Sequence, residues 1–485
     1  MIKIEEILKN DYEKWKNREY IFEKKNEKYE SITFGNFIEN VVYLADYLID
    51  KNLKNKKIVI FSENSINWMI SDIAIMSYVG ESVTVSKEWK YDELREALNF
   101  LDIDCIIYSD TKKDIIEKIK LEFSDMMYIC MQDDFKTIFE NGQKLNLKKA
   151  DMFDFEPKEI NSCSKIIFTS GTTSSPKAVM LSLKNIFSGY ESLRRRVQFD
   201  ETDICYLFLP LTHTYGNIYN FVFSLISGYT IYLASATENI SKELLEVNPT
   251  IFSAVPLIYV KLYEGYKENI NKAFGERIKY LFCGGAYFDE NIRRIYKDKK
   301  LNMMEAYALS ETSSSFSIEY PYTDDTKSVG TIFEDIDVRI LKPDETGNGE
   351  IAVKGDNVFL GYANNSELTK KAFNDEGYFF TGDIGYVKDN KLYITGRKKN
   401  VIIGTNGENI SPDVLEDKIK KLNNNINKVK VFLNQNELNC HLYLLKEDDT
   451  NWDEFFNSFN DKVPKYEKIV KYEIFIDSIE KRLKQ

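Results

Sequence analysis

Short apolar runs alternate with longer amphipathic stretches over the first third of the chain, and this rhythm limits the fold more than any other feature. Residues 57–61 (KIVIF), 82–85 and 105–109 predict buried strands, and residues 65–78 predict a helix. Strands that alternate with helices favour a layered α/β architecture with parallel strands. The pattern returns in four later runs, at residues 165–169, 230–233, 250–255 and 279–282.

After about residue 330 the sequence pattern changes. Short segments typical of strands, at 337–341 and 350–353, are separated by stretches rich in turn-forming residues. From Val401 onward, short Lys- and Asn-rich segments alternate between helix and strand patterns. A single core seldom grows beyond roughly 250–300 residues, whereas this chain has 485. We therefore predict a large N-terminal layered α/β domain with a β-rich subdomain, residues 1–396, and a small mobile α+β C-terminal domain, residues 397–485.

The net charge and the spacing of the cysteines argue against several classes of protein. The chain has 65 basic and 77 acidic residues, and its net charge of −12 argues against a nucleic-acid-binding protein. Its cysteines occur singly, without a CxxC pair, which argues against a disulfide framework or a zinc site. The charged N-terminal segment lacks the apolar stretch of a secretion signal. We therefore expect a cytoplasmic protein.

Residues 204–237 carry no formal charge and raise the question of a membrane span. Pro210, Gly216 and Gly228 interrupt this stretch, and its apolar run at 218–226 is far shorter than the ~20 residues that a spanning helix needs. The stretch therefore predicts a buried helix and strand, without a membrane span.

The sharpest local signal is residues 168–177 (FTSGTTSSPK), directly after the strand-like run KIIF. Hydroxyl side chains and backbone N–H groups around Gly171 can donate to phosphate oxygens, and Lys177 adds a positive charge. The segment is not the common P-loop, because GxxxxGK[ST] is absent. From composition alone, a polar surface turn explains it equally well.

Further segments follow in order: residues 209–216 (LPLTHTYG), 283–286 (CGGA), 307–311 (YALSE), 378–383 (YFFTGD) and 395–400 (TGRKKN). Together with the hydroxyl-rich loop, they resemble the motifs of the adenylate-forming superfamily of acyl-CoA synthetases, luciferases and peptide-synthetase adenylation domains. The resemblance extends over nearly the whole chain, from Asn64 and Trp68 to the C-terminal domain.

This resemblance implies a nucleotide site for ATP and Mg²⁺. By resemblance, Lys177, Glu311 and Lys484 are catalytic, and Glu311 holds Mg²⁺ with a hard carboxylate oxygen. Asp383 is expected to accept from the ribose hydroxyls, and Arg397 to bind ribose or phosphate oxygens with its planar fork of donors. The implied nucleotide-binding set is Thr169, Ser170, Gly171, Thr172, Thr173, Lys177, Gly284, Gly285, Ala286, Tyr307, Ser310, Asp383 and Arg397.

Each of these residues also has an ordinary structural interpretation. The alternatives are a surface ion pair for Glu311, a turn at Asp383, a solvated basic run at Arg397, a core tyrosine at Tyr307 and a strand-end turn at Gly284 and Gly285.

The resemblance also implies a pocket for the acid, with His213 as a gate on the carboxylate side. Tyr215, Tyr219, Phe223 and Pro256 are candidate walls, and Ala308 is expected to narrow the acyl channel. A general base is not needed, because a carboxylic acid is already ionised at pH 7. Residues 212–223 contain no Asp or Glu that could pair with an amino acid's ammonium group. An unpaired ammonium in an apolar pocket is costly, so a fatty or aryl acid is favoured over an amino acid. The aromatic walls fit an ordinary core as well, and a lone histidine is often structural.

Four departures from the family pattern stand out. Ser174, Ala178 and Ala308 occupy positions where the family often has glycine. The chain ends in SIEKRLKQ, without the Gly-rich loop that carries the family's catalytic lysine. Lys484 is the nearest candidate and Lys481 the next, and a charged, frayed tail is the alternative for both. The family's hinge falls on Lys399, and its thiol channel beside Gly407.

The function implied is ATP-dependent activation of a carboxylic acid to acyl-AMP, followed by transfer of the acyl group to the thiol of CoA. A second hypothesis is a stand-alone adenylation enzyme that loads the phosphopantetheine arm of a carrier protein. The third is a nucleotide- or acyl-binding homologue weakened in catalysis by the missing lysine. The sequence leaves open the identity of the acid, the thiol acceptor and the oligomeric state.

Overall fold

The computed structural model describes residues 4–156, 158–169, 177–398, 402–403, 409–410, 412–434, 437–447, 449–463 and 467–476. The chain divides into two compact units. The first comprises Met1–Asp337 and Lys354–Phe379, and the second comprises Val338–Val353 and Phe380–Gln485. The predicted boundary between residues 396 and 397 stays a prediction.

One sheet of the first unit has seven strands in the order β18-β8-β7-β4-β3-β5-β6. Strands β6, β5, β3, β4 and β7 run parallel, β8 is antiparallel to β7, and β18 is antiparallel to β8. Their bounds are β3 (Lys57–Phe61), β4 (Glu81–Thr84), β5 (Cys105–Tyr108), β6 (Met127–Cys130), β7 (Cys163–Thr169), β8 (Lys177–Ser182) and β18 (Gly361–Tyr362).

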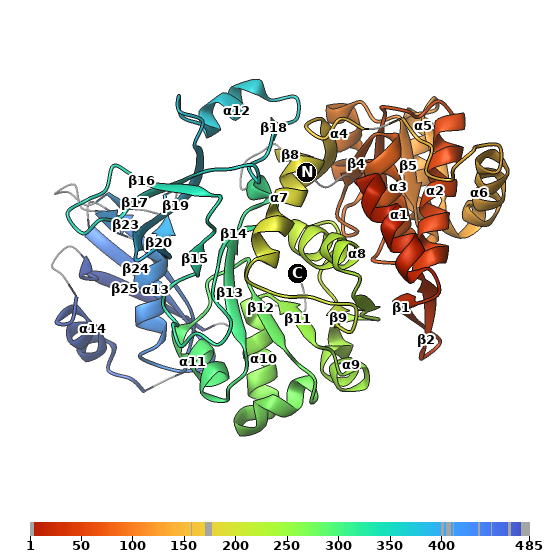
Figure 1. Cartoon of the computed structure of the whole chain (residues 1–485). Coiled ribbons are helices and arrows are strands. Elements are labelled where there is room, and N and C mark those ends of the chain that lie inside the picture. Colours follow the sequence, from red (N-terminus) through yellow and green to blue (C-terminus); the bar gives the residue numbers. More distant parts are fainter. Residues whose placement is uncertain are drawn as a thin grey trace. The chain divides into compact units, whose positions relative to one another are not determined.

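Helices α1 (Ile4–Trp15), α2 (Phe34–Asp50), α3 (Ile66–Ala74), α4 (Tyr91–Leu101), α5 (Lys113–Glu122) and α6 (Met131–Asn146) accompany this sheet (Figure 1). Apolar side chains at helical spacing on α4 pack against the buried strands, in a cluster that includes Val59, Leu94, Leu98, Ile106 and Ile116. This burial of apolar surface holds the layers together.

A second sheet in the first unit runs in the order β15-β14-β13-β12-β11-β9-β10-β1-β2. Its strands β1, β10, β9, β11, β12 and β13 are parallel, and β14 turns back antiparallel to β13. The bounds are β1 (Glu19–Lys25), β2 (Lys28–Thr33), β9 (Ile204–Leu207), β10 (Thr230–Leu233), β11 (Ile251–Ala254), β12 (Tyr280–Cys283), β13 (Met303–Ala308), β14 (Ser315–Ile318) and β15 (Thr331–Ile332).

The helices that follow in the chain are α7 (Leu183–Arg194), α8 (Phe223–Ser227), α9 (Ile240–Val247), α10 (Pro256–Tyr266) and α11 (Glu290–Asp298). Helices α9, α10 and α11 pack on the sheet through a second core that includes Leu244, Phe252, Leu262, Leu281 and Tyr296. Helix α12 (Ser366–Ala372) contacts β18 of the first sheet.

The second unit contains strands β16 (Asp337–Leu341), β17 (Gly349–Lys354), β19 (Phe379–Lys388) and β20 (Lys391–Arg397), in that order. A separate three-stranded sheet combines β23 (Ile426–Asn434), β24 (Glu437–Leu444) and β25 (Lys471–Ile476). Helices α13 (Pro412–Lys420) and α14 (Trp452–Asn460) cover its core, and β21 (Ile402–Ile403) pairs with β22 (Asn409–Ile410).

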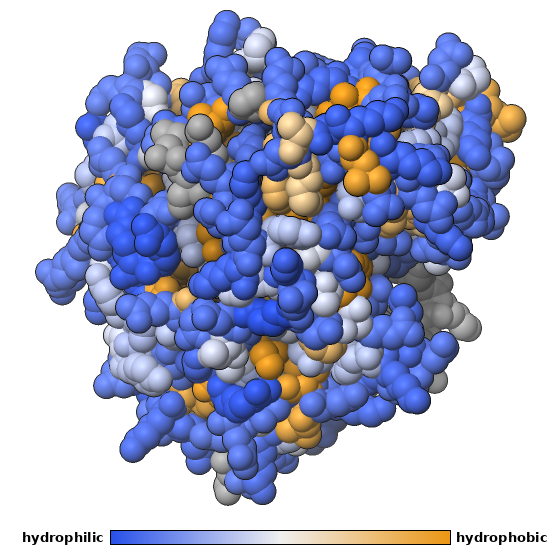
Figure 2. All heavy atoms as spheres, turned by 45° about the vertical axis from the view of Figure 1, so that its right-hand side comes forward, coloured by the Kyte–Doolittle hydropathy of each residue, from blue (hydrophilic) through white to orange (hydrophobic). Residues whose placement is uncertain are grey.

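The predicted α/β class is confirmed, and every strand predicted above is present within one or two residues of its expected bounds. The helix expected at 65–78 is α3 followed by a π-helical turn, Ile75–Val79. The uncharged stretch 204–237 forms β9, a π-helical segment η3 (Tyr215–Val222), α8 and β10. Among the described residues, no helix combines the length and apolarity that crossing a membrane requires. On the face shown in Figure 2, hydrophobic residues form only small, separate groups.

Asp11 on α1 is a buried carboxyl group that makes stability depend on pH. Its side chain is 6% exposed, and Oδ2 has no hydrogen-bond partner among the described residues. Burial raises the pKa of Asp11 to about 8. Between the ordinary carboxyl range and pH 8, the unfolded chain loses this proton while the folded chain keeps it, so stability falls as pH rises.

Replacing Asp11 with Asn is therefore expected to make the free energy of unfolding depend less on pH in this range. The variant should gain free energy of unfolding relative to the unsubstituted protein between pH 5 and pH 8, by about 1 kcal/mol or more. Urea unfolding of both proteins at several pH values measures the difference. Parallel profiles over this range would show that Asp11 ionises normally in the folded protein.

Candidate active site

Strands β7 and β8 form a hairpin that carries the two ends of the predicted phosphate loop. Thr169, the last residue of β7, lies opposite Lys177, the first residue of β8, in antiparallel register. The Thr169 hydroxyl donates to the Lys177 carbonyl oxygen at 3.5 Å. Both ends lie at the carboxyl edge of the parallel strands, where open α/β sheets bind ligands. The intervening predicted residues Ser170, Gly171, Thr172 and Thr173 are outside the described part of the chain.

Tyr362 contacts both Lys177 and Glu311. Its hydroxyl donates to Glu311 Oε1 at 2.8 Å, and Lys177 Nζ lies 5.1 Å from the centre of its ring. Burial, followed by the charge of Glu311, raises the pKa of Tyr362 well above its ordinary value, so the phenol stays protonated and donates. The structure thus brings together the predicted phosphate-binding cation and the predicted magnesium ligand, through a residue that the sequence analysis missed.

Glu311 and Ser310 lie in a tight 3-10 turn, Ser310–Thr312, directly after the carboxyl end of β13. The Thr312 hydroxyl caps this turn by accepting from the Leu309 amide at 2.9 Å. The Phe359 amide donates to the Glu311 carbonyl oxygen at 2.8 Å, which attaches the turn to the segment that carries Tyr362. Glu311 Oε2 has no hydrogen-bond partner among the described residues, so one hard oxygen remains available to a cation.

The predicted adenine segment follows β12, whose carboxyl end is next to that of β13. A side chain at Gly284 would place its Cβ 2.9 Å from the Ala306 carbonyl oxygen, and Gly285 has φ of +84°. Both positions therefore favour glycine, and Gly285 and Ala286 are exposed at the strand end. Tyr307 is buried, with its ring edge-on to Phe316 at 4.9 Å. A core role for Tyr307 and a role in adenine binding are both compatible with this packing.

The predicted acid pocket lies at the same sheet edge. The Tyr215 hydroxyl donates to the Phe282 carbonyl oxygen of β12 at 2.9 Å, and the Tyr219 ring contacts those of Tyr215 and Phe282. Pro256 is buried at the first turn of α10, directly after β11, and Ala308 ends β13. His213 precedes η3 and is exposed, although desolvation by the surrounding protein lowers its pKa. The lowered pKa favours the neutral form of His213, and its role as a gate stays a prediction.

Hydrogen bonds of two asparagine side chains attach residues 209–217 to elements of the first sheet and its helices. Asn64, after β3, donates to the Leu209 carbonyl oxygen at 2.9 Å and accepts from the Leu211 amide at 3.0 Å. Asn217 on η3 donates to Asp72 Oδ2 on α3 at 2.8 Å. Asp72 is fully buried, and it also forms an ion pair with the fully buried Lys165 of β7. One carboxylate therefore connects β7, which leads to the predicted phosphate loop, with η3, which carries residues of the predicted acid pocket.

Asp383 and Arg397 belong to the second unit, where they are paired across strands β19 and β20. Arg397 Nε lies 3.1 Å from Asp383 Oδ1, with Asp383 buried and Arg397 66% exposed. The structure thus brings these two predicted ribose ligands together. Their convergence on Lys177 and Glu311 stays a prediction. The positions of Lys399, Gly407 and Lys484 lie outside the described residues.

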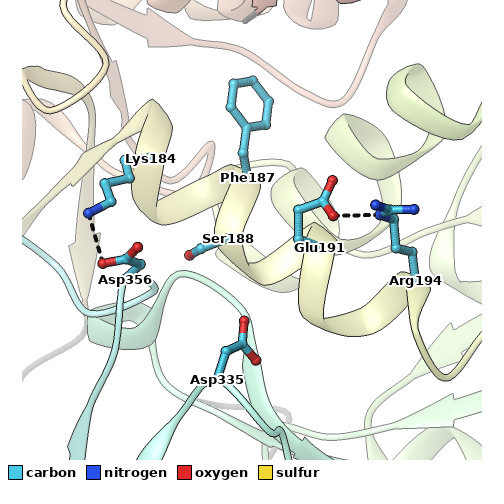
Figure 3. Close-up of a pocket in the computed structure, with 7 residues that line it drawn as sticks. All are labelled: Lys184, Phe187, Ser188, Glu191, Arg194, Asp335 and Asp356. Carbon is cyan, nitrogen blue, oxygen red and sulfur yellow. Dashed lines mark hydrogen bonds and ion pairs between the residues drawn. The ribbon is translucent and has the colours of Figure 1, made fainter. Parts of the chain in front are cut away.

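A groove of about 480 Å³ runs along α7 (Figure 3). It is lined by Lys184, Phe187, Ser188, Glu191, Arg194, Asp335 and Asp356. Its cations are paired with its own carboxylates: Lys184 with Asp356 at 2.8 Å and Arg194 with Glu191 at 2.6 Å. Because these charges neutralise one another, the groove does not offer a free cation to a phosphate group.

Asn185 on α7 fixes the loop that leads to Tyr362. Its side-chain oxygen accepts from the Ser182 amide at 2.9 Å, and its amide group donates to the carbonyl oxygens of Asp356 and Val358, both at 2.8 Å. Replacing Asn185 with Ala removes all three bonds: the buried one from the Ser182 amide and the two part-buried ones to the Asp356 and Val358 carbonyl oxygens. We expect a loss of about 2–4 kcal/mol in the free energy of unfolding.

Chemical denaturation of the Asn185→Ala variant measures this loss. Ser188→Ala, one turn further along α7, is the control, because its hydroxyl only returns to the Asn185 carbonyl oxygen at 2.9 Å. An equal, small effect of both substitutions would contradict the role assigned to Asn185.

Comparison with known proteins adds an independent finding. The sequence profile of the family described as AMP-binding enzyme matches residues 8–363. Long-chain-fatty-acid–CoA ligase ACSBG2 of Xenopus laevis is 25% identical over 496 residues, covering 87% of this chain and 66% of that protein. Long-chain-fatty-acid–CoA ligase ACSBG1 of Rattus norvegicus is 26% identical over 470 residues, covering 82% and 64%. The chain spans slightly less than two thirds of the length of these two curated relatives.

Solved structures show the same fold at low identity. ATP-bound MatB from Rhodopseudomonas palustris has a TM-score of 0.84 and 19% identity, over 99% of this chain and 98% of that chain. O-succinylbenzoate coenzyme A synthetase from Bacillus subtilis, in complex with ATP and magnesium ion, has a TM-score of 0.80 and 20% identity, over 97% and 95%. The predicted fold and the predicted family resemblance are both confirmed.

Proposed function

The chain belongs to the AMP-binding enzyme family, and on that premise we propose that it activates a carboxylic acid with ATP and transfers the acyl group to a thiol. The observation that carries the proposal is the Lys177–Tyr362–Glu311 arrangement at the carboxyl edge of the first sheet. It places a cation suited to phosphate beside a carboxylate suited to a divalent cation.

In the first step, an oxygen of the acid's carboxylate attacks the α-phosphorus of ATP, and the bond to the bridging oxygen of pyrophosphate breaks. The reaction depends on positioning and charge neutralisation, because the attacking group is already ionised. Lys177 would neutralise phosphate oxygens, and Tyr215 and Tyr219 would orient the acid's tail. Asp383 and Arg397 would bind the ribose.

Glu311 would hold Mg²⁺ through Oε2, and that ion would neutralise charge on the phosphates. In the second step, a thiolate attacks the acyl carbon, and AMP leaves with the oxygen that came from the acid. A turn of the C-terminal domain about Lys399, with Gly407 beside the thiol, is part of the proposal. Lys484 is the candidate for the family's C-terminal lysine.

A fatty or aryl acid fits the pocket better than an amino acid. Residues 212–223 contain no carboxylate, and the described walls are the aromatic rings of Tyr215, Tyr219 and Phe282. Both curated relatives are named as ligases of long-chain fatty acids and CoA. CoA is therefore the leading acceptor, ahead of a carrier-protein phosphopantetheine.

The test is an isotope experiment across acids of different length and aromaticity. Each acid is labelled with ¹⁸O in its carboxylate and incubated with ATP, Mg²⁺ and CoA, and the products are analysed by mass spectrometry. We expect acyl-CoA and AMP that carries one ¹⁸O. Unlabelled AMP, or ADP as the product, would exclude an acyl-adenylate intermediate.

A further inference from the structure

Tyr362 lies between two opposite charges that would otherwise attract each other. Among the residues that the structure describes, neither Lys177 nor Glu311 takes part in an ion pair within 4.0 Å. Lys177 Nζ lies over the ring of Tyr362, and Glu311 accepts from its hydroxyl at 2.8 Å. Each charge is thus bound to a different part of one neutral side chain.

The position of the Tyr362 ring is fixed from several directions. Tyr362 pairs with Val179 across β18 and β8, so it is a diagonal neighbour of Lys177 on the same face. The Tyr362 amide donates to the Thr369 hydroxyl at 2.9 Å, and its ring is edge-on to that of Phe359 at 4.9 Å. Tyr362 is buried, with 5% of the residue exposed.

This rigidity has a consequence for a phosphate site. Opposite charges attract strongly where protein partly replaces water, and a direct ion pair would satisfy both groups internally. A lysine paired in that way has to break the pair before it can meet a phosphate oxygen. An aromatic face attracts a cation without carrying a compensating charge, so it leaves the positive charge available.

We propose that Tyr362 is a positioning residue that keeps Lys177 and Glu311 apart, so that one remains available for phosphate and the other for a divalent cation. This inference rests on the proposed function and adds a role that the motifs do not assign. It predicts that the ring and the hydroxyl of Tyr362 act on different ligands: the ring on phosphate through Lys177, and the hydroxyl on the cation through Glu311.

The test measures ATP binding by calorimetry in the presence of EDTA. Tyr362→Leu and Tyr362→Phe are each made in two backgrounds: the otherwise unchanged chain and the chain that carries Glu311→Gln. Tyr362→Leu should weaken binding of metal-free ATP about tenfold, because Lys177 then pairs with Glu311. The loss should disappear in the Glu311→Gln background, where no carboxylate remains to capture the lysine. Tyr362→Phe keeps the ring and should bind metal-free ATP normally, but should change the Mg²⁺ concentration needed for half-maximal MgATP binding about tenfold.

Tyr206→Phe is the matched control, because it removes a buried hydroxyl that donates to Glu243 at the same distance of 2.8 Å, on β9. It should leave both binding measurements unchanged. An equal loss from Tyr362→Leu in both backgrounds, or no loss in either, would overturn the inference. Failure of the unsubstituted chain to bind ATP at all would instead reject the proposed function.

Discussion

Substituting Lys177 with Met is expected to slow acid-dependent exchange between pyrophosphate and ATP by about 100- to 1000-fold, the usual cost of removing one preorganised group that stabilises developing charge. Lys177 is the first residue of β8, opposite the last residue of β7, and its ammonium group lies over the Tyr362 ring. In the proposal above, this ring keeps Lys177 away from carboxylates. Methionine retains the apolar stem over the Tyr362 ring, so the fold should be little affected.

Lys184→Met is the matched control for this substitution. Lys184 is only seven positions further along the chain, but its ammonium group is paired with Asp356 at 2.8 Å in the α7 groove. Its replacement should leave exchange close to that of the unsubstituted protein. Comparable losses from the two substitutions would mean that exchange responds to net charge and not to the position of Lys177.

Substituting Asp72 with Ala is expected to lower the free energy of unfolding by about 3–5 kcal/mol, because it leaves the buried Lys165 ammonium without its counterion. Lys165 and Asp72 are both fully buried, and burial lowers the pKa of Lys165. The same change also removes the acceptor for Asn217, which loosens the link between α3 and the acid-pocket helix.

A paired replacement separates loss of charge compensation from loss of packing. Asp72→Leu combined with Lys165→Met removes both charges and keeps apolar volume, and buried pairs replaced in this way are often neutral in stability. Urea unfolding of the single and paired variants makes the comparison. If the paired variant is no more stable than Asp72→Ala, the uncompensated charge of Lys165 is not the cause.

The elements of the fold that could be predicted are those whose apolar residues form a local pattern in the sequence. Buried strands such as β3 and β5 are short, uninterrupted apolar runs, and the turn signals around them mark their ends. The predictions of site residues rest on contiguous motifs, residues 168–177 and 307–311, and the roles of Thr169, Lys177, Ser310 and Glu311 stay predictions. Such motifs carry their chemistry in adjacent residues, so spacing alone is informative.

The missed residues have partners that are distant in the chain. Tyr362 is 51 positions from Glu311, and Asp72 is 93 positions from Lys165 and 145 from Asn217. A tyrosine after glycine, or an aspartate within an amphipathic helix, has many ordinary explanations in one sequence. Their role depends on which strands become neighbours, and that is decided by the packing of whole layers.

The most direct test of the account is the transfer of labelled pyrophosphate into ATP by the purified full-length chain, with Mg²⁺ and a panel of fatty and aryl acids. We predict exchange only when a suitable acid is present, and its loss when Lys177→Met and Glu311→Gln are combined. Exchange that persists in the combined variant would contradict the account, because the nucleotide would then react without the two charges that Tyr362 holds apart.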